Sequence, residues 1–330
     1  MVKQQSLALL ALVACVLAVG VIALGAYTRL NDAGLGCPDW PGCYGQVTVP
    51  QGEAAHYLYN NSSFSAAKAW AEMLHRYFAG SLTLLLIGIF FVGGLLSVEQ
   101  PKRSNILLLG ALALLLLYQI ALGRWTVTLK LLPIIVTQHL LGGLGILSLL
   151  WLLYLSNRKL PFTALPNNRG LRWGAGVGLA LVLLQLFLGA WTSTNYASLS
   201  CPDFPFCHNS SPSIFAWRDA FHLLLPAGVN YQGGVLADTV RQSIQMAHRI
   251  GAMVVSIYLL GFGLIAQQQL RRDGAVLSSL NLIMVLVLLQ LSLGMAGVVF
   301  QLPLSIALAH TLVAAGILLS LITFNYRLYR

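Results

Sequence analysis

Residues 25–43 of the chain read GAYTRLNDAGLGCPDWPGC, and residues 189–207 read GAWTSTNYASLSCPDFPFC. The two stretches share the frame C-P-D-[WF]-P-x-C, and both cysteines of the first stretch recur in the second, each 164 positions later. These cysteines are Cys37, Cys43, Cys201 and Cys207. A frame repeated at this distance in a chain of 330 residues indicates that the second half duplicates the first. We therefore expect two similar halves, residues 1–160 and 161–330, related by pseudo-symmetry.

Four of the seven histidines follow the same duplication. The segment EMLHRYFAG corresponds to QMAHRIGAM and aligns His75 with His248. The segment TQHLLGG corresponds to LAHTLVA and aligns His139 with His310. Histidines scattered through a core would not form two matched sets, so these four are candidates for a shared function.

The composition is that of an integral membrane protein. The chain is 58% hydrophobic and 8% charged, whereas soluble domains carry about 25% charged residues. Eight apolar runs are each long enough to cross a bilayer core as a helix. They are continuous and rich in leucine, which favours an all-α protein over a barrel with alternating strands. The runs lie near 6–27, 72–97, 105–124, 133–155, 172–192, 244–267, 277–299 and 304–325.

The net charge of +10 is a topology signal and does not indicate nucleic-acid binding. Eleven of the nineteen basic residues lie in alternate loops or at the termini, so the positive-inside rule places both termini in the cytoplasm. The cysteine-bearing segments, about 28–71 and 193–243, are then extracytoplasmic, where disulfides persist. The N-terminus shows no long Arg- and Ser-rich leader, which favours a bacterial inner membrane over an organelle.

The four repeated histidines lie near the starts of even-numbered spans, which in this topology begin on the outer side. Two histidines from facing membrane helices are a common way to hold haem iron, whereas zinc lacks its usual further ligands here. The alternative is that each histidine only hydrogen-bonds between helices. Two matched pairs at one depth favour the haem interpretation, because ionisable residues inside a membrane are costly and usually functional.

Glu72 distinguishes the first half from the second. It precedes His75 by three residues and shares its helical face, while Gln245 holds the equivalent position before His248. If both halves bind a porphyrin, only the first has an ionisable group beside it, which makes the first half the candidate reaction site. The alternative is that Glu72 lies at the water interface and favours the helix N-terminus.

Arginines and prolines complete the two repeated sets. Arg76 and Arg249 follow the aligned histidines, where a guanidinium could pair with porphyrin propionates or extend to the interface.

Prolines between the cysteines of each loop restrict the backbone and hold the thiols close, which suits a small exposed disulfide. The alternative is a purely structural loop staple.

These residues together resemble the haem A synthase family, membrane enzymes that convert haem O to haem A for cytochrome oxidases. The resemblance covers essentially the whole chain. It rests on TRLNDAGLGCPDWPGC at 28–43, EMLHR at 72–76, QH at 138–139, AHR at 247–249 and AH at 309–310. The first cysteine loop and E-x-x-H-R are highly specific, while the last pair alone would be weak.

The resemblance implies a pseudo-two-fold pair of four-helix bundles and a role for each matched residue. His248 and His310 would be the axial ligands of a haem b cofactor, His75 and His139 the ligands of the substrate haem, Glu72 the catalytic carboxylate, and Cys37–Cys43 an extracytoplasmic disulfide. The role of Cys201 and Cys207 is left open, as is that of the loop from 208 to about 242. The implied reaction oxidises a methyl group of haem O through a hydroxymethyl stage to a formyl group.

The implied partners are haem O, membrane lipid, haem O synthase, oxidase assembly factors and an external electron partner, since the sequence has no flavin or nicotinamide site. Two other functions stay open. A dihaem b-type electron carrier would have two equivalent histidine pairs and no reason for Glu72 opposite Gln245. A haem carrier or oxidase assembly factor without catalysis would use the loops and leave haem unchanged.

Overall fold

The computed structural model describes residues 2–61, 64–99, 102–158, 168–204, 207, 216–270 and 274–329. Within these residues the chain is helical and forms no β-strand, which confirms the expected all-α class. Eight helices are long and apolar enough to cross a membrane, as the hydropathy pattern predicts. They are α1 (Val2–Leu30), α3 (Ala66–Glu99), α4 (Arg103–Thr128), α5 (Pro133–Asn157), α6 (Arg169–Thr194), α8 (Asp238–Gln269), α9 (Gly274–Val299) and α10 (Leu304–Tyr329).

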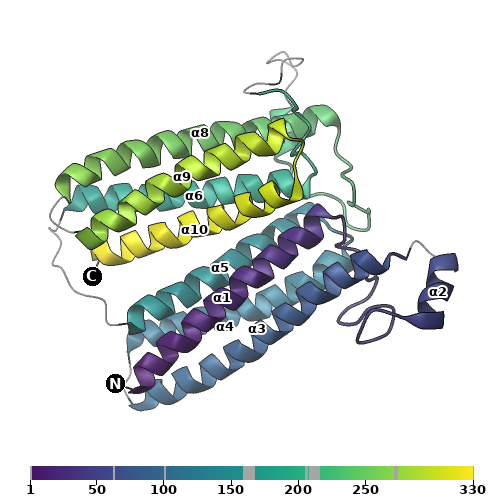
Figure 1. Ribbon diagram of the computed structural model, residues 1–330, viewed down its shortest axis with the longest axis horizontal. Coiled ribbons are helices and arrows are strands. Elements are labelled where there is room, and N and C mark those ends of the chain that lie inside the picture. Colours follow the sequence, from purple (N-terminus) through teal and green to yellow (C-terminus); the bar gives the residue numbers. More distant parts are fainter. Residues whose placement is uncertain are drawn as a thin grey trace. The chain divides into compact units, whose positions relative to one another are not determined.

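Two short helices lie in the segments between the spans. Helix α2 (Gly52–Asn61) follows the first cysteine loop, and α7 (Trp217–Ala220) lies in the long segment before α8. Figure 1 shows α2 beyond the ends of α1 and α3, away from the spanning part of its own unit. The sequence analysis did not predict α2, because it is polar and too short to produce an apolar run.

Chain contacts divide the described structure into two compact units. The first is Met1–Leu150 with His222–Val235, and the second is Trp151–Phe221 with Leu236–Arg330. Helices α1, α3, α4 and most of α5 belong to the first unit, and α6, α8, α9 and α10 to the second (Figure 1). The boundary between 160 and 161 that the duplication predicts lies outside the described residues.

The duplication is visible in the turns that join the helices. After α1 and α6, Asp32 and Tyr196 adopt positive φ values of 50° and 55°. Leu131 after α4 and Leu302 after α9 do the same, at 61° and 60°. Such values are rare for residues other than glycine, so their recurrence at corresponding positions shows that the two halves share local backbone geometry.

The segment 222–235 has no counterpart in the first half of the sequence, and it packs within the first unit. Tyr231 is 2% exposed, and its backbone N–H donates to Lys130 O at 3.0 Å in the α4–α5 turn. The Gln232 side chain donates to Asp32 O at 2.9 Å, just past α1. This segment therefore covers the end of the unit at which α1 and α4 finish. Residues 208–215, which belong to the same loop, lie outside the described residues.

Candidate functional site

His75 on α3 and His139 on α5 face each other in the first unit. Their ring centroids are 6.3 Å apart and their planes are nearly perpendicular, at 87°. Both side chains stay partly exposed although they point at another helix. A metal ion bound to two imidazole nitrogens at about 2 Å each would separate the rings by roughly this distance. The spacing of the two rings therefore suits a metal ion bound by one nitrogen of each ring.

The surroundings of His75 leave the correct nitrogen available for a metal. Its Nδ1 lies 3.1 Å from the backbone oxygen of Val21 on α1. A carbonyl oxygen can only accept, so Nδ1 carries the proton and Nε2 keeps its lone pair, as in most metal-ligating histidines. Gly25 lies against the ring, and a Cβ added there would come within 3.0 Å of His75 Cε1. The glycine is therefore required for this close approach.

The second unit contains the corresponding pair, His248 on α8 and His310 on α10. Gly189 on α6 lies against His248, and Gly294 on α9 lies against His310, with an added Cβ at 3.1 Å and 3.2 Å from Cε1. The second half thus repeats the arrangement of histidine against glycine.

Comparison of these contacts reveals a fourfold motif that the sequence analysis missed. Each helix that faces a histidine carries the pattern [VQ]-[IL]-x-L-G, and its glycine is the residue that touches the imidazole. The motifs, which we call histidine-facing motifs, are VIALG at 21–25, QIALG at 119–123, QLFLG at 185–189 and QLSLG at 290–294. The first begins with valine and the other three with glutamine. Comparison of all four odd-numbered spans, and not only of the two halves, would have found the pattern in the sequence.

Two of the motif glutamines contact the histidine helix directly. Gln119 donates to the backbone oxygen of His139 at 2.8 Å. Gln185 Nε2 lies 3.0 Å from the backbone oxygen of His248 and 2.9 Å from its Nδ1. The amide oxygens of Gln119, Gln185 and Gln290 are buried without a hydrogen-bond partner among the described residues.

Glu72 is buried and fixed by the first cysteine loop. It is 5% exposed, and its Oε2 accepts the backbone N–H of Cys37 at 2.8 Å while Oε1 pairs with Arg76. Helix α3 begins at Ala66, so Glu72 lies beyond its first turn. Its burial and these two contacts favour a carboxylate fixed inside the protein over one that only serves the helix N-terminus at the water interface. Gln245, at the equivalent position, is also 5% exposed, but its Oε1 has no partner within the described structure.

Arg76 and Arg249 both bind the backbone of a cysteine loop. Arg76 donates to the oxygen of Asp39 at 2.9 Å, and Arg249 donates to the oxygen of Asp203, the equivalent residue, at 2.7 Å. Arg249 also donates to Cys201 O at 2.6 Å. The suggestion that these arginines pair with propionates has no support in these contacts. Each one instead ties a cysteine loop to the helix that carries a histidine.

Each cysteine loop is closed by a disulfide. Cys37 pairs with Cys43, and Cys201 pairs with Cys207. In the first loop the Asp39 carboxylate accepts the N–H groups of Tyr44 and Gly45 at 2.6 and 2.7 Å. Burial raises the pKa of the Tyr44 hydroxyl above its ordinary value, and the carboxylates of Asp39 and Glu72 raise it further. Tyr44 therefore stays neutral at physiological pH.

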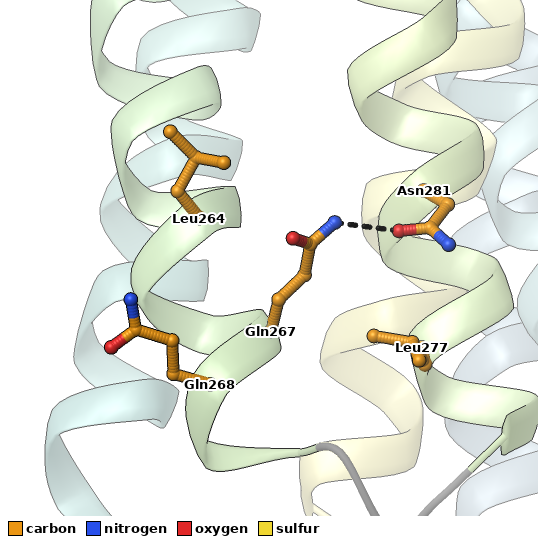
Figure 2. Close-up of a pocket in the computed structure, with 5 residues that line it drawn as sticks. All are labelled: Leu264, Gln267, Gln268, Leu277 and Asn281. Carbon is orange, nitrogen blue, oxygen red and sulfur yellow. Dashed lines mark hydrogen bonds between the residues drawn. The ribbon is translucent and has the colours of Figure 1, made fainter.

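Other polar groups lie away from these histidines. Figure 2 shows a surface pocket between α8 and α9, where Gln267 donates to Asn281 at 2.7 Å beside Leu264, Gln268 and Leu277. It lies near the end of α8, whereas His248 is near its beginning. Within the described ranges, no three His, Cys, Asp or Glu side chains are grouped so that they could hold a metal ion together.

Comparisons with known proteins agree with this geometry. The family model COX15-CtaA, described as a cytochrome oxidase assembly protein, matches residues 8–322. A protein of Shewanella oneidensis named Heme A synthase is 43% identical over 317 residues, which cover 94% of this chain and 92% of that protein. A protein of the same name from Lysinibacillus sphaericus is 26% identical, over 87% of this chain and 84% of its own length. Another from Chelativorans sp. is 28% identical, over 94% of this chain and 87% of its own length.

Proposed function

We propose, from the premise that the chain belongs to the COX15-CtaA family of cytochrome oxidase assembly proteins, that it is a haem A synthase. In this function it is a membrane enzyme that oxidises a methyl group of haem O, through a hydroxymethyl stage, to the formyl group of haem A. The observation that carries the proposal is a facing histidine pair in a unit that also holds a buried carboxylate.

The second unit would hold haem b between His248 and His310. The repeated histidine–glycine contacts and the amide beside His248 support this assignment. When bound, haem b supplies one-electron chemistry, while the protein sets its position and surroundings. The protein groups that would position haem b are the imidazoles of His248 and His310 and the glutamines of the two motifs that face them.

The first unit would bind the substrate haem O between His75 and His139. Glu72 projects from the same helix as His75, and the hydrogen bond from Cys37 N–H and the ion pair with Arg76 hold its carboxylate in one orientation. A carboxylate fixed near the reacting methyl group could accept a proton from it or stabilise positive charge that develops on the carbon. Gln245 cannot accept a proton in this way, which accounts for assigning the reaction to the first unit.

The proposed setting is the bacterial inner membrane, with both termini in the cytoplasm and both cysteine loops outside. The clustering of basic residues in alternate loops supports this orientation. Oxidation of a methyl group to a formyl group releases electrons and protons and adds one oxygen atom. An external electron acceptor must take the electrons, and water would supply the oxygen. A haem O synthase that supplies the substrate and oxidase assembly factors that receive the product are the remaining proposed partners.

The decisive experiment is chromatography of haems extracted from cells that express this chain together with a source of haem O. We expect haem A when the chain is present and haem O alone when it is absent. Haem B and unchanged haem O would contradict the proposal and favour an electron carrier or a non-catalytic assembly factor. His75→Ala is the matched control, because it should abolish haem A while the second unit keeps its haem b.

A further inference from the structure

The end of the first unit at which α4 finishes carries a positive charge that the second unit lacks. Arg124 on α4 directly follows Gly123, the motif glycine that packs against the His139 ring. We propose that Arg124 is a substrate-binding residue that pairs with a propionate of haem O in the first unit. The inference rests on the proposed function and deepens it, because it names the group that would recognise the acidic edge of the substrate.

The guanidinium of Arg124 is available for such a ligand. The residue is exposed, and its side chain makes no hydrogen bond, ion pair or ring contact with the residues that the structure describes. By contrast, Arg76 already pairs with Glu72 and with the backbone of the first cysteine loop. Arg124 therefore offers a guanidinium that a carboxylate can bind through two parallel hydrogen bonds.

The depth of Arg124 in the membrane makes its charge unusual. It lies four residues before α4 ends at Thr128, about 6 Å along the helix axis, and inside a stretch apolar enough to span a membrane. In the proposed orientation this end is on the outer side, where the positive-inside rule does not call for basic residues. An arginine inside a span is costly and usually marks a substrate or ion pathway. A bound carboxylate would offset that cost.

The second unit has uncharged residues at the corresponding positions. Met295 corresponds to Arg124, and Gln301 corresponds to Lys130, which is exposed in the turn after α4. This difference fits the two proposed roles. A substrate haem must be captured in every turnover, and positive charges attract its two propionates. A cofactor that stays bound needs no repeated capture.

The test compares Arg124→Met, which copies the second unit, with the unchanged protein, both purified with their haem b. Each is titrated with haem O and with haem O dimethyl ester, whose propionates carry no charge, and binding is followed by the Soret difference spectrum. We expect the substitution to weaken haem O binding at least about tenfold, the lower end for a hydrogen bond to a charged group. Binding of the ester should stay the same. The KM for haem O should rise with little change in kcat, because the contact holds the substrate and not the reacting methyl group.

Arg103→Met is the matched control, since Arg103 lies at the other end of α4 and should affect neither ligand. Arg124→Gln should behave like Arg124→Met and serves if the methionine variant fails to fold. Unchanged haem O binding in the Arg124 variants would overturn the inference. So would an equal loss of haem O and ester binding, which would mean that Arg124 binds a lipid headgroup or supports the fold.

The two proposals fail in different ways. If the unchanged protein bound haem O through Arg124 but formed no haem A, the proposed function would be wrong and the propionate contact would stand. If haem A formed and Arg124→Met bound haem O normally, the reverse would hold.

Discussion

The two units carry the same framework around their histidines and differ in the groups that touch it. In both, an arginine one residue after a histidine binds the backbone of a disulfide-closed loop, and a glycine packs against each imidazole. Two of the positions that differ involve polar groups near a histidine: Glu72 corresponds to Gln245, and Val21 corresponds to Gln185. In the proposed function, the duplicated parts would build the two porphyrin sites, and the differences at these positions would distinguish the substrate site from the cofactor site.

The histidines should give the largest effect. We expect His75→Ala and His139→Ala to abolish haem A formation while haem b stays bound, because in the proposed function these two histidines hold only the substrate. His248→Ala or His310→Ala should instead lower the haem b content, since loss of one axial ligand weakens that site. Pyridine haemochrome spectra of purified variants, together with haem A yield, measure both properties. Equal loss of haem b from all four variants would remove the distinction between the units.

Glu72 should give the next largest effect. Glu72→Gln keeps the size of the side chain and an acceptor for Cys37 N–H but removes the charge that pairs with Arg76. We expect haem A formation to fall at least about a hundredfold, the lower end of general acid–base contributions, with haem b unchanged. Initial rates of haem A formation in membranes test this.

Gln245→Ala is the matched control for Glu72, because it alters the equivalent position in the cofactor unit. We expect it to leave haem A formation within about twofold of the unchanged protein, since its Oε1 has no partner within the described residues. A normal yield from Glu72→Gln would mean that the carboxylate only anchors the cysteine loop. The reaction would then have to use another group.

The spanning helices and the histidine pairs were predictable from the sequence, because continuous apolar runs and exact repeats are local signals. The ends of the helices were harder to predict from the sequence. Helix α3, for example, begins at Ala66, several residues before the apolar run, because a helix continues through polar residues such as Lys68. The contacts of Arg76 and Arg249 with the cysteine loops could not be predicted, since their acceptors are backbone oxygens and have no sequence signature. The contact between Val21 and the His75 ring also uses a backbone oxygen, so the sequence did not predict it either.

The disulfides should show a smaller difference between the units. In the first loop Cys37 donates its N–H to Glu72, so opening this loop releases one of the groups that orient the carboxylate. We expect the Cys37→Ser, Cys43→Ser double variant to keep its haem b but to form haem A about fivefold more slowly, as loss of a hydrogen bond of about 1 kcal/mol would predict. Haem content and initial rate are the measurements.

The control is the Cys201→Ser, Cys207→Ser double variant, in which Gln245 has no such orienting bond to lose. It should slow haem A formation by about twofold or less. Complete loss of haem b from the first double variant would show that its loop builds the cofactor site, contrary to the division between the units. Equal rates in the two double variants would remove the link between the first disulfide and Glu72.

The smallest effect on stability should come from the segment 222–235, which packs over the α4–α5 turn of the first unit. Leu131 in that turn is buried, at 9% exposed, whereas Leu302, its counterpart in the α9–α10 turn, is half-buried. The Tyr231 hydroxyl donates to Pro226 O at 2.7 Å and shapes the segment from within. Burial raises the pKa of this hydroxyl, so it stays protonated and remains a donor at neutral pH.

We expect Tyr231→Phe to remove that hydrogen bond while keeping the buried ring, and so to lower the free energy of unfolding by about 1 kcal/mol. Thermal unfolding in detergent measures this, with Tyr329→Phe as a control because Tyr329 is 63% exposed. Haem b content and the rate of haem A formation should not change. A large loss of haem A formation without a loss of stability would mean that the segment contacts the substrate, and the spanning helices of the first unit would then not suffice to define the substrate site.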